Sequence, residues 1–349
     1  MLRMNLSVNT IDEARSLKLR YVRDAQPGIT RKRQGKKFVY TLNGKTVRDE
    51  ATLERIRKLV IPPAWEKVWI CPSENGHLQA TGYDVRGRKQ YRYHTKWNEA
   101  RNETKFHRLN EFGKALEKIR ARVKKDLSLP GLPLNKVLAT VITLMDMTGI
   151  RIGNNEYEKL YGSYGLSTMK DKHVTINGAQ LRFAFKGKKG VQHEITVRNQ
   201  KLAKIVKQCR DIPGSELFQY RDENGVRHSI DSGMVNAYIH EIAGADFTSK
   251  DFRTWNGTVY AFTTLREMAA ATEETNVSKQ LLTMFDAVAK KLGNTRAVCK
   301  KYYVHPGIVQ LHESNQLVKA VVRKAAVRGL KHLDADEQQL ICTLQKMAA

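Results

Sequence analysis

The sequence has few cysteines and no long apolar run. The four cysteines stand far apart, at Cys71, Cys209, Cys299 and Cys342, with no Cys-x-x-Cys pair and no Cys/His cluster of metal-ligand spacing. We therefore expect buried free thiols instead of disulfides or a zinc site. No apolar stretch reaches the ~18 to 20 residues that span a bilayer, and the N-terminus lacks a signal-peptide core. These absences predict a soluble, intracellular protein of the cytoplasm.

The signatures of nucleotide-dependent and zinc-dependent enzymes are absent as well. The chain contains no Gly-x-x-x-x-Gly-Lys-Ser/Thr loop, no Gly-x-Gly-x-x-Gly turn and no His-Glu-x-x-His helix. The sequence gives no reason to expect ATP, a dinucleotide or zinc, and we predict that no cofactor is required.

Acidic residues are scarce relative to basic ones. The 349 residues include 35 Asp plus Glu against 61 Lys plus Arg, a formal net charge of +26. Such an excess favours a polyanionic partner, either nucleic acid or an anionic membrane. A basic protein that simply carries its charge in solution is the alternative on composition alone. With 41% hydrophobic residues, the chain can form one large core or two smaller ones, and its length favours two domains.

The first hundred residues are typical of short strands separated by turns. One helix is expected after Asp49, a favourable N-cap, because apolar residues recur at helical spacing until Pro62-Pro63 stops the run. The expected strands are residues 38–42, 68–71, 78–83 and 90–94. We therefore predict a small β-rich N-terminal domain over residues 1–98.

From about Glu99 the pattern changes to amphipathic helices. The predicted fold class is α+β, with a mainly helical second domain over residues 99–349 whose part after about 312 is a helical tail. Three predicted strands (173–176, 180–186 and 192–197) form a meander inside it. The helices are expected at residues 106–127, 135–148, 200–210, 234–242, 256–271 and 278–292, with two more in 314–349.

A tyrosine near the end of the chain is the leading candidate for a covalent nucleophile. Tyr303 lies in the run Lys300-Lys301-Tyr302-Tyr303-Val304-His305-Pro306. A phenol has a pKa of about 10 and is a poor nucleophile at neutral pH, so it needs cations and hydrogen-bond donors around its target. Tyr302 and Tyr303 cannot both point into one site, since helical neighbours are about 100° apart. The candidates to assist are, in chain order, Arg151, Lys188, Arg253 and Asn294.

Arg151 and Lys188 each sit beside glycines. Gly149 and Gly153 bracket Arg151 just past a predicted helix, where a planar guanidinium can approach two phosphate oxygens. A solvated surface arginine is the alternative. Lys188 lies in the loop that joins two predicted strands and could protonate a leaving oxygen. Its neighbours Lys186 and Lys189 compete for that role, and a hairpin tip that only touches the DNA backbone is the other interpretation.

Arg253 and Asn294 flank predicted helices. Arg253 leads into a helix expected to start near Asn256. Asn294 follows Gly293, a predicted helix C-cap, and precedes the helix that is expected to carry Tyr303. In a continuous helix Asn294 and Tyr303 would be about 13 Å apart along the axis. They can meet on one phosphate only if that helix bends, ends early or moves, and Asn294 could instead be a plain N-cap.

Several further blocks accompany these residues in order. They are Ile61-Pro62-Pro63-Ala64-Trp65, the stretch from Gln79 to His94, Gly149 to Asn154, Gly187-Lys188, Lys250 to Trp255, and Tyr303-Val304-His305-Pro306. Over roughly residues 15 to 312 the chain resembles the compact bacterial and poxvirus-like type IB DNA topoisomerases.

That resemblance implies a mechanism. Tyr303 would attack a DNA phosphodiester, form a 3′-phosphotyrosyl link and release a 5′ hydroxyl; the cut strand would rotate and be resealed without ATP or metal. Arg151 and Arg253 would stabilise the transition state, Lys188 would act as general acid, and Asn294 would donate a hydrogen bond to a nonbridging oxygen. Many relatives have histidine where this chain has Asn294, and an amide cannot change charge near neutrality.

The resemblance also implies a DNA-binding N-terminal domain. Two alternatives stay open for its aromatic stretch: Tyr91 and Tyr93 contact the major groove, or they pack into a small core while only the charges face outward. The basic run from Arg31 to Lys37 is interpreted as a loop that is solvated or contacts the DNA backbone. The predicted DNA-binding residues are Arg86, Arg88, Lys89, Gln90, Tyr91, Tyr93 and Lys250.

Two other function classes remain. A tyrosine recombinase or integrase uses the same chemistry, but it usually has histidine at the place of Lys250. A noncatalytic DNA-packaging protein would account for the charge and not for the ordered motifs. We predict a monomer that closes around double-stranded DNA and binds it mainly through phosphate contacts.

Overall fold

The computed structural model describes residues 6–35, 37–85, 87, 89–271, 276–317 and 329–348. The chain divides into two compact units, Met1–Lys105 and Phe106–Ala349. The division falls near the end of one helix, α3 (Thr95–His107). Among the helices of the described ranges, none has an apolar stretch long enough to cross a bilayer. All four cysteines are unpaired, and three of them are buried.

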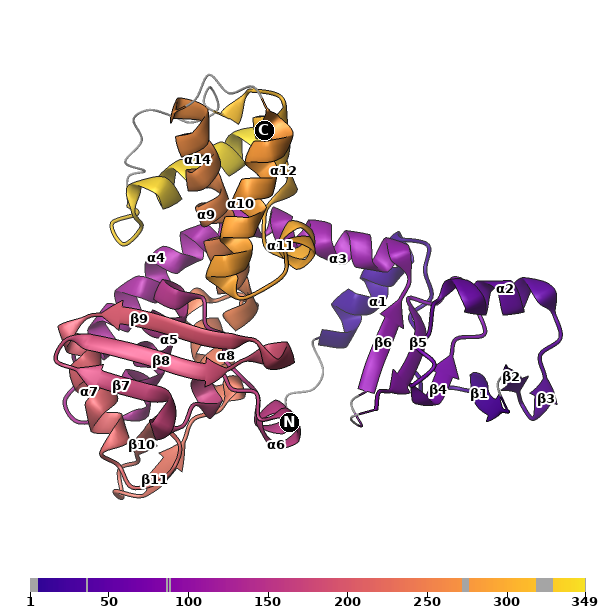
Figure 1. Cartoon of the computed structure of the whole chain (residues 1–349), viewed down its shortest axis with the longest axis horizontal. Helices are drawn as coiled ribbons and strands as arrows, with labels where there is room; N and C mark the ends of the chain where they lie inside the picture. The colour runs from indigo at the N-terminus through magenta and orange to yellow at the C-terminus, as the bar shows by residue number, and fades with distance from the viewer. Residues whose placement is uncertain are drawn as a thin grey trace. The chain divides into compact units, whose positions relative to one another are not determined.

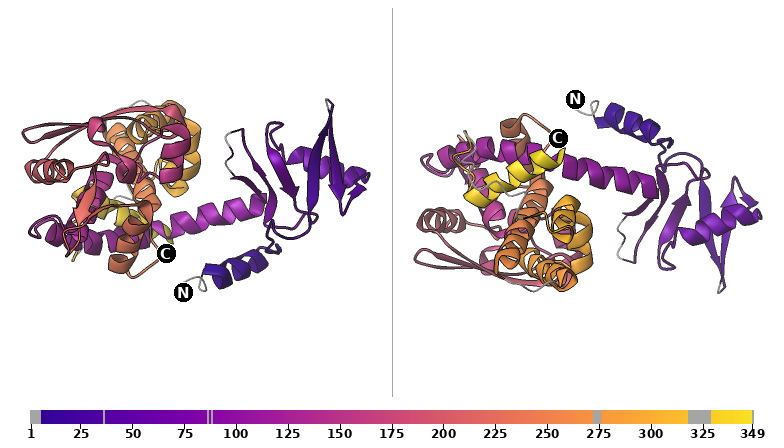
Figure 2. Two further views of the ribbon diagram at one scale, coloured as in Figure 1. Left: turned by 90° about the horizontal axis from the view of Figure 1, so that it is seen from below. Right: turned by 90° about the horizontal axis from the view of Figure 1, so that it is seen from above.

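The first unit contains an antiparallel sheet of six strands in the order β3-β2-β1-β4-β5-β6. Helix α2 begins after Asp49, whose side chain accepts a hydrogen bond from the Thr52 N–H as expected of an N-cap. Ile56 of α2 packs on apolar residues of the sheet. Helix α2 and the sheet lie side by side in Figure 2 (indigo to purple). The elements are α1 (Leu6–Ser16), β1 (Ile29–Gln34), β2 (Lys37–Leu42), β3 (Lys45–Thr46), α2 (Glu50–Lys58), β4 (Glu66–Ile70), β5 (Leu78–Tyr83) and β6 (Lys89–Tyr93).

The basic run after Gly28 is a strand, and the predicted loop there is wrong. Strand β1 pairs with β2 along its length, with Arg31 opposite Tyr40. The Arg31 guanidinium is bound to the protein backbone, where it donates hydrogen bonds to the carbonyls of Ile61, Pro62 and Trp65. Cross-strand pairing and these backbone contacts outweigh the polarity that suggested a loop.

The second unit combines helices with a three-stranded antiparallel sheet, β7-β8-β9, which confirms the predicted meander. In Figure 1 the sheet and α7 lie at one end of the unit, and α9, α10, α12 and α14 gather at the other. The elements are α4 (Leu109–Asp126), α5 (Leu134–Thr148), α6 (Asn155–Tyr161), β7 (Val174–Asn177), β8 (Gln180–Lys186), β9 (Gln192–Arg198), α7 (Gln200–Arg210), β10 (Gln219–Arg221), β11 (Arg227–Ser229), α8 (Ser232–Ala243), α9 (Ser249–Ala271), α10 (Val277–Leu292), α11 (Arg296–Tyr302), α12 (Pro306–Glu313) and α14 (Ala335–Ala348), with short 3-10 turns η1 (Leu166–Thr168), η2 (Asp171–His173) and η3 (Lys188–Gly190).

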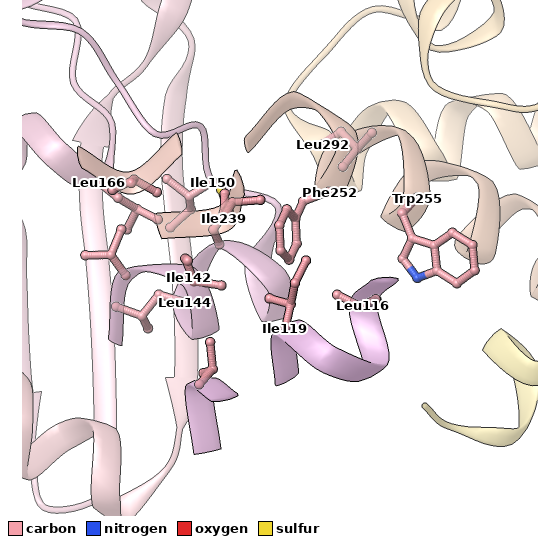
Figure 3. Packing of buried hydrophobic residues seen from close by; sticks show 14 of the residues in the cluster. Leu116, Ile119, Ile142, Leu144, Ile150, Leu166, Ile239, Phe252, Trp255 and Leu292 are labelled. Carbon is pink, nitrogen blue, oxygen red and sulfur yellow. The ribbon is translucent and has the colours of Figure 1, made fainter. Parts of the chain in front are cut away.

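Helix α9 forms the centre of this unit. Its Phe252 and Trp255 are fully buried and point toward Leu116 and Ile119 of α4 (Figure 3). Phe112 of α4 packs edge-on against both aromatic rings. The burial of these large apolar side chains contributes several kcal/mol to the stability of the fold. Their close packing also holds α9 rigidly in this unit.

The C-terminal segment belongs to the same core. Leu340, Ile341 and Leu344 of α14 are buried in the main hydrophobic cluster. Glu337 of α14 accepts hydrogen bonds from Arg120 of α4 and from the indole of Trp255. Of the two helices predicted after residue 313, one is α14; the other would fall largely on residues 318–328, outside the described ranges.

Candidate active site

Arg253 lies on α9, which begins at Ser249 and not near Asn256 as predicted. The side chain is 5% exposed. Its guanidinium donates hydrogen bonds to the carbonyl of Gly149, which caps α5, and to that of Leu292, the last residue of α10. Arg253 thus ties the ends of two other helices to α9. Its guanidinium carbon lies 5.1 Å from the centre of the Tyr303 ring.

Tyr303 lies one residue beyond the end of α11. Its backbone leaves the helical conformation (φ −128°, ψ −11°) while its N–H still donates to the Cys299 carbonyl. The helix therefore ends early, which is one of the conditions named for Tyr303 to approach Asn294. Tyr302, by contrast, is the last helical residue, and its side chain is 39% exposed.

The backbone of Tyr303 is fixed against α9. The Thr258 hydroxyl donates to the Tyr303 carbonyl at 3.2 Å and accepts from the His305 N–H at 3.2 Å. Gly257 packs against the same segment: a β-carbon on it would lie 2.6 Å from the Tyr303 carbonyl oxygen. Since Gly257 is one turn beyond Arg253, a single helix face positions both the arginine and the tyrosine.

Arg151 joins Asn294 to Tyr303. It follows Gly149, whose left-handed conformation (φ 67°) ends α5. Its Nη2 donates to the Asn294 side-chain oxygen at 2.6 Å, and its guanidinium also hydrogen-bonds the Tyr303 side chain. Burial and the neighbouring Arg253 lower the pKa of Arg151 to about 10, against the opposing effect of Tyr303. Arg151 therefore remains a cation at neutral pH.

Asn294 is not the N-cap of α11, so that alternative is wrong. Thr295 is the N-cap, and its hydroxyl accepts from the Val298 N–H. Gly293 ends α10 in the left-handed conformation (φ 57°), as predicted, and Asn294 comes directly after it. Its oxygen is held by Arg151, and its amide nitrogen donates a long 3.4 Å hydrogen bond to the Leu292 carbonyl.

Lys188 begins the turn η3 between β8 and β9. Its Nζ lies 5.3 Å from the centre of the Tyr157 ring, and the side chain is exposed at a cavity wall. Partial desolvation by the surrounding protein lowers the pKa of Lys188, and Arg151 adds to this effect. Lys189, one of its two competitors, has a left-handed backbone (φ 63°).

These side chains converge on one place. A cavity of about 530 Å³ is lined by Arg151, Lys188, Asn294 and Tyr303 together. Arg253 lines a second, narrower cavity with Arg151 and Lys188. Residues that are up to 152 positions apart in the chain (151 to 303) therefore surround a single space.

The family described as "Eukaryotic DNA topoisomerase I, catalytic core" matches residues 94–327. That described as "Bacterial DNA topoisomerase IB, N-terminal domain" matches residues 37–84. The chain is 34% identical to DNA topoisomerase 1B of Acanthamoeba polyphaga mimivirus over 298 residues, which is 82% of this chain and 88% of the relative. The chain belongs to the type IB DNA topoisomerases. It is thus a type I topoisomerase, and the resemblance found in the sequence is confirmed.

Poxvirus relatives are more distant. The chain is 24% identical to DNA topoisomerase 1B of vaccinia virus (strain Copenhagen) over 249 residues and to DNA topoisomerase I of monkeypox virus over 243 residues. Each match covers 69% of this chain and 74% of the relative. The family match to the catalytic core ends at residue 327, so α14 of this topoisomerase lies beyond it.

Four of the predicted DNA-binding residues of this topoisomerase, Lys89, Gln90, Tyr91 and Tyr93, lie on β6. Tyr91 and Tyr93 are 48% and 39% exposed with their rings stacked 6.0 Å apart, so they do not form a closed core. Lys89 pairs with Asp24 at 2.5 Å, and Gln90 donates to Asp84 at 3.0 Å. The predicted residues Arg86 and Arg88 lie outside the described residues.

Lys250 occupies the second position of α9 and is exposed. Its charge helps to lower the pKa of Lys188, after the larger effects of desolvation and Arg151. The charge density there is therefore positive on several sides.

Two residues of the site were not predicted from the sequence. Tyr157 of α6 lies against Lys188, and His193 of β9 lines both cavities. Neither belongs to a motif that distinguishes it from the other tyrosines and histidines of the chain. His193 could have been suspected only from the alternation of strand β9, which places residues of one parity on one face.

Proposed function

We propose that this topoisomerase relaxes supercoiled duplex DNA, without ATP or metal ions, through a transient 3′-phosphotyrosyl intermediate. The observation that carries the proposal is a shared site: Tyr303, Arg151, Lys188 and Asn294 line one cavity, and Arg253 lines an adjoining one with its guanidinium 5.1 Å from the Tyr303 ring. Type IB membership supports the same conclusion.

In the cleavage step, the Tyr303 phenol oxygen attacks the phosphorus of a phosphodiester and its proton is lost to solvent. The bond from phosphorus to the 5′ oxygen breaks, and the Lys188 ammonium gives its proton to that oxygen. The products are a 3′-phosphotyrosyl end and a free 5′ hydroxyl. Rejoining is the reverse reaction. Since one phosphoester replaces another, no nucleotide is needed to restore the strand.

The cations stabilise the charge that develops on the phosphoryl oxygens. Arg253 uses two of its five N–H donors on protein carbonyls, and its Nε–H has no hydrogen-bond partner among the described residues. Arg151 stands beside the tyrosine oxygen that attacks. Preorganised donors of this kind are worth about 10²- to 10³-fold each in rate.

Asn294 is oriented by Arg151. Because its side-chain oxygen accepts the 2.6 Å hydrogen bond, the amide nitrogen is the end that remains to donate to a nonbridging oxygen. The neighbouring cation thus decides which end of the amide faces the substrate.

The protein would act as a monomer that surrounds duplex DNA. The charge of +26 supports contacts made mainly to the phosphates, with binding that weakens steeply as salt rises. Exposed Tyr91 and Tyr93 support groove contact by β6. We place this activity in the cytoplasm, on the nucleoid.

The test is relaxation of negatively and positively supercoiled plasmid in EDTA and without ATP. We expect stepwise relaxation, a protein–DNA adduct on the 3′ end of the nick, and loss of both in Tyr303→Phe with DNA binding retained. A protein that exchanges strands between two duplexes without relaxing plasmid would be a recombinase instead. An adduct that survives Tyr303→Phe would move the nucleophile, first of all to Tyr302.

A further inference from the structure

The imidazole of His193 lies between two glycines that come from distant parts of the chain. Gly187 precedes Lys188 in the loop after β8, and Gly293 precedes Asn294 after α10. A β-carbon on Gly187 would lie 2.6 Å from His193 Cδ2. One on Gly293 would overlap His193 Cε1 and lie 3.0 Å from Nε2. Real β-carbons do not come this close to a ring, so the imidazole occupies the space that a side chain at either position would need.

The ring is held in place from behind. His193 is the cross-strand partner of Phe185, and the two rings stack with centres 5.0 Å apart and an angle of 14°. Phe185 is buried in the main hydrophobic cluster. A ring packed on a buried aromatic neighbour has few alternative rotamers and acts as a rigid spacer.

Both glycines adjoin residues of the proposed mechanism. The His193 ring therefore separates the loop that carries Lys188 from the turn that carries Asn294. We propose that His193 is a positioning residue, which sets the distance between Lys188 and Asn294 across the scissile phosphate. This inference rests on the proposed function, because it concerns the same cleavage step.

The charge state suits a spacer. Burial, with Arg151 and Arg253 nearby, lowers the pKa of His193 below its ordinary value of 6.5, so the ring is neutral at physiological pH. A neutral ring fills the gap beside two arginines without adding a further positive charge.

The experiment measures single-turnover cleavage of two DNA substrates that differ in one atom. One has the natural 5′ oxygen at the scissile position and the other has sulfur there. A thiolate, with a pKa of about 8.5 for its conjugate acid, leaves without a proton, so the sulfur substrate does not need a well-placed Lys188. A defect in positioning Lys188 slows the oxygen substrate selectively, whereas a general loss of structure slows both.

For His193→Ala we expect cleavage of the oxygen substrate to fall about 10²-fold, the cost of a misplacement near 1 Å. The fall in the cleavage rate of the sulfur substrate should be at least about tenfold smaller than that of the oxygen substrate. DNA affinity should be unchanged. Lys188→Ala should show the same selectivity. Val197→Ala is the matched control, since it shortens a buried side chain on the same face of β9 away from both glycines. It should slow the two substrates equally or not at all.

A second measurement tests the contact itself. Gly187 has φ −90° and ψ −168°, a conformation open to alanine. The His193 ring is the close neighbour of an added methyl group there, whereas the Val191 carbonyl oxygen, at 3.5 Å, is at ordinary contact distance. Gly187→Ala should therefore slow the oxygen substrate in the wild-type background and cost little more in His193→Ala. Contacting residues show this kind of non-additivity.

The outcomes separate the two proposals. Equal defects on both substrates in His193→Ala, no defect on either, or fully additive effects of the two substitutions would each overturn the positioning role. Absence of cleavage of either substrate by the wild-type protein would instead overturn the proposed function.

Discussion

Arg151 donates a 2.6 Å hydrogen bond to the side-chain oxygen of Asn294, and the same guanidinium hydrogen-bonds the Tyr303 side chain. One cation thus connects the proposed nucleophile to the side-chain amide of Asn294. The pair explains how an uncharged residue can serve at this place, since its orientation comes from the arginine and not from its own protonation state.

Asn294→Ala should slow single-turnover cleavage by about 10²-fold and leave DNA affinity near normal, because it removes one donor to the transition state. Asn294→Asp should be as slow: a carboxylate would pair with Arg151 and offers no N–H. Quench-flow cleavage and a filter-binding assay check this. Unchanged cleavage in Asn294→Ala would remove Asn294 from the catalytic set.

Asn294→His supplies a matched comparison. The histidine variant should gain a pH dependence between about pH 5 and 8 that the wild-type protein lacks, since only imidazole titrates there. A cleavage rate that follows the same pH profile in both proteins would contradict a direct role for this position.

The pKa of Lys188 is lowered by partial desolvation and by Arg151, so its ammonium loses its proton at a lower pH than an ordinary lysine. The protonated form is the acid. Cleavage of the oxygen substrate should therefore decline as pH rises through this lowered pKa. The decline should be absent on DNA with a sulfur leaving group. The same alkaline decline on both substrates would assign it to another residue.

Gly257→Ala should impair cleavage while DNA binding persists. In an exposed helix, alanine in place of glycine gains about 1 kcal/mol of stability. Here the added methyl group would lie 2.6 Å from the Tyr303 carbonyl oxygen, so the tyrosine segment must move. Thr258→Val should act in the same direction through loss of its two hydrogen bonds. Calorimetry measures the stability of the variants, and formation of the DNA adduct measures their cleavage. A stabilised, fully active Gly257→Ala would show that the contact does not position Tyr303.

Arg120→Ala should destabilise the second unit by about 3 to 5 kcal/mol, since it leaves buried carboxylates without their partner. Arg120 binds Asp146 and Glu337 through hydrogen bonds of 2.6 to 3.2 Å, and Glu337 is 4% exposed. Thermal unfolding measures the loss. Arg57→Ala, which breaks an exposed pair with Glu50 and Glu54, is the control and should change stability little.

Local signals in the sequence predicted much of the fold. The Asp49 cap, the strands joined by Asn177-Gly178, and Gly293 at the end of α10 each follow from a residue whose own conformational preference decides the structure. The start of α9 was misplaced because Ser249 to Thr254 are mostly polar. Their helix depends on the buried Phe252 and Arg253, whose partners lie far away in the chain.

The predicted catalytic residues do converge, but the contacts that orient them could not be predicted. Gly293 was predicted as a helix end, but nothing local indicates that it meets the His193 ring. Likewise, Thr258 binds a carbonyl 45 positions later in the chain. Such contacts arise from tertiary packing, and the periodicity of apolar residues along a helix or strand does not predict them.

The attachment of Tyr303 to α9 has a mechanical consequence. In the proposed covalent intermediate the 3′ end of the cut strand is bonded to Tyr303. Torque from DNA rotation would then pass from Tyr303 through its contacts with Gly257 and Thr258 into α9. Trp255, on the same helix, is anchored by its indole to Glu337 of α14. In that intermediate the C-terminal helix α14 would brace α9 against this torque.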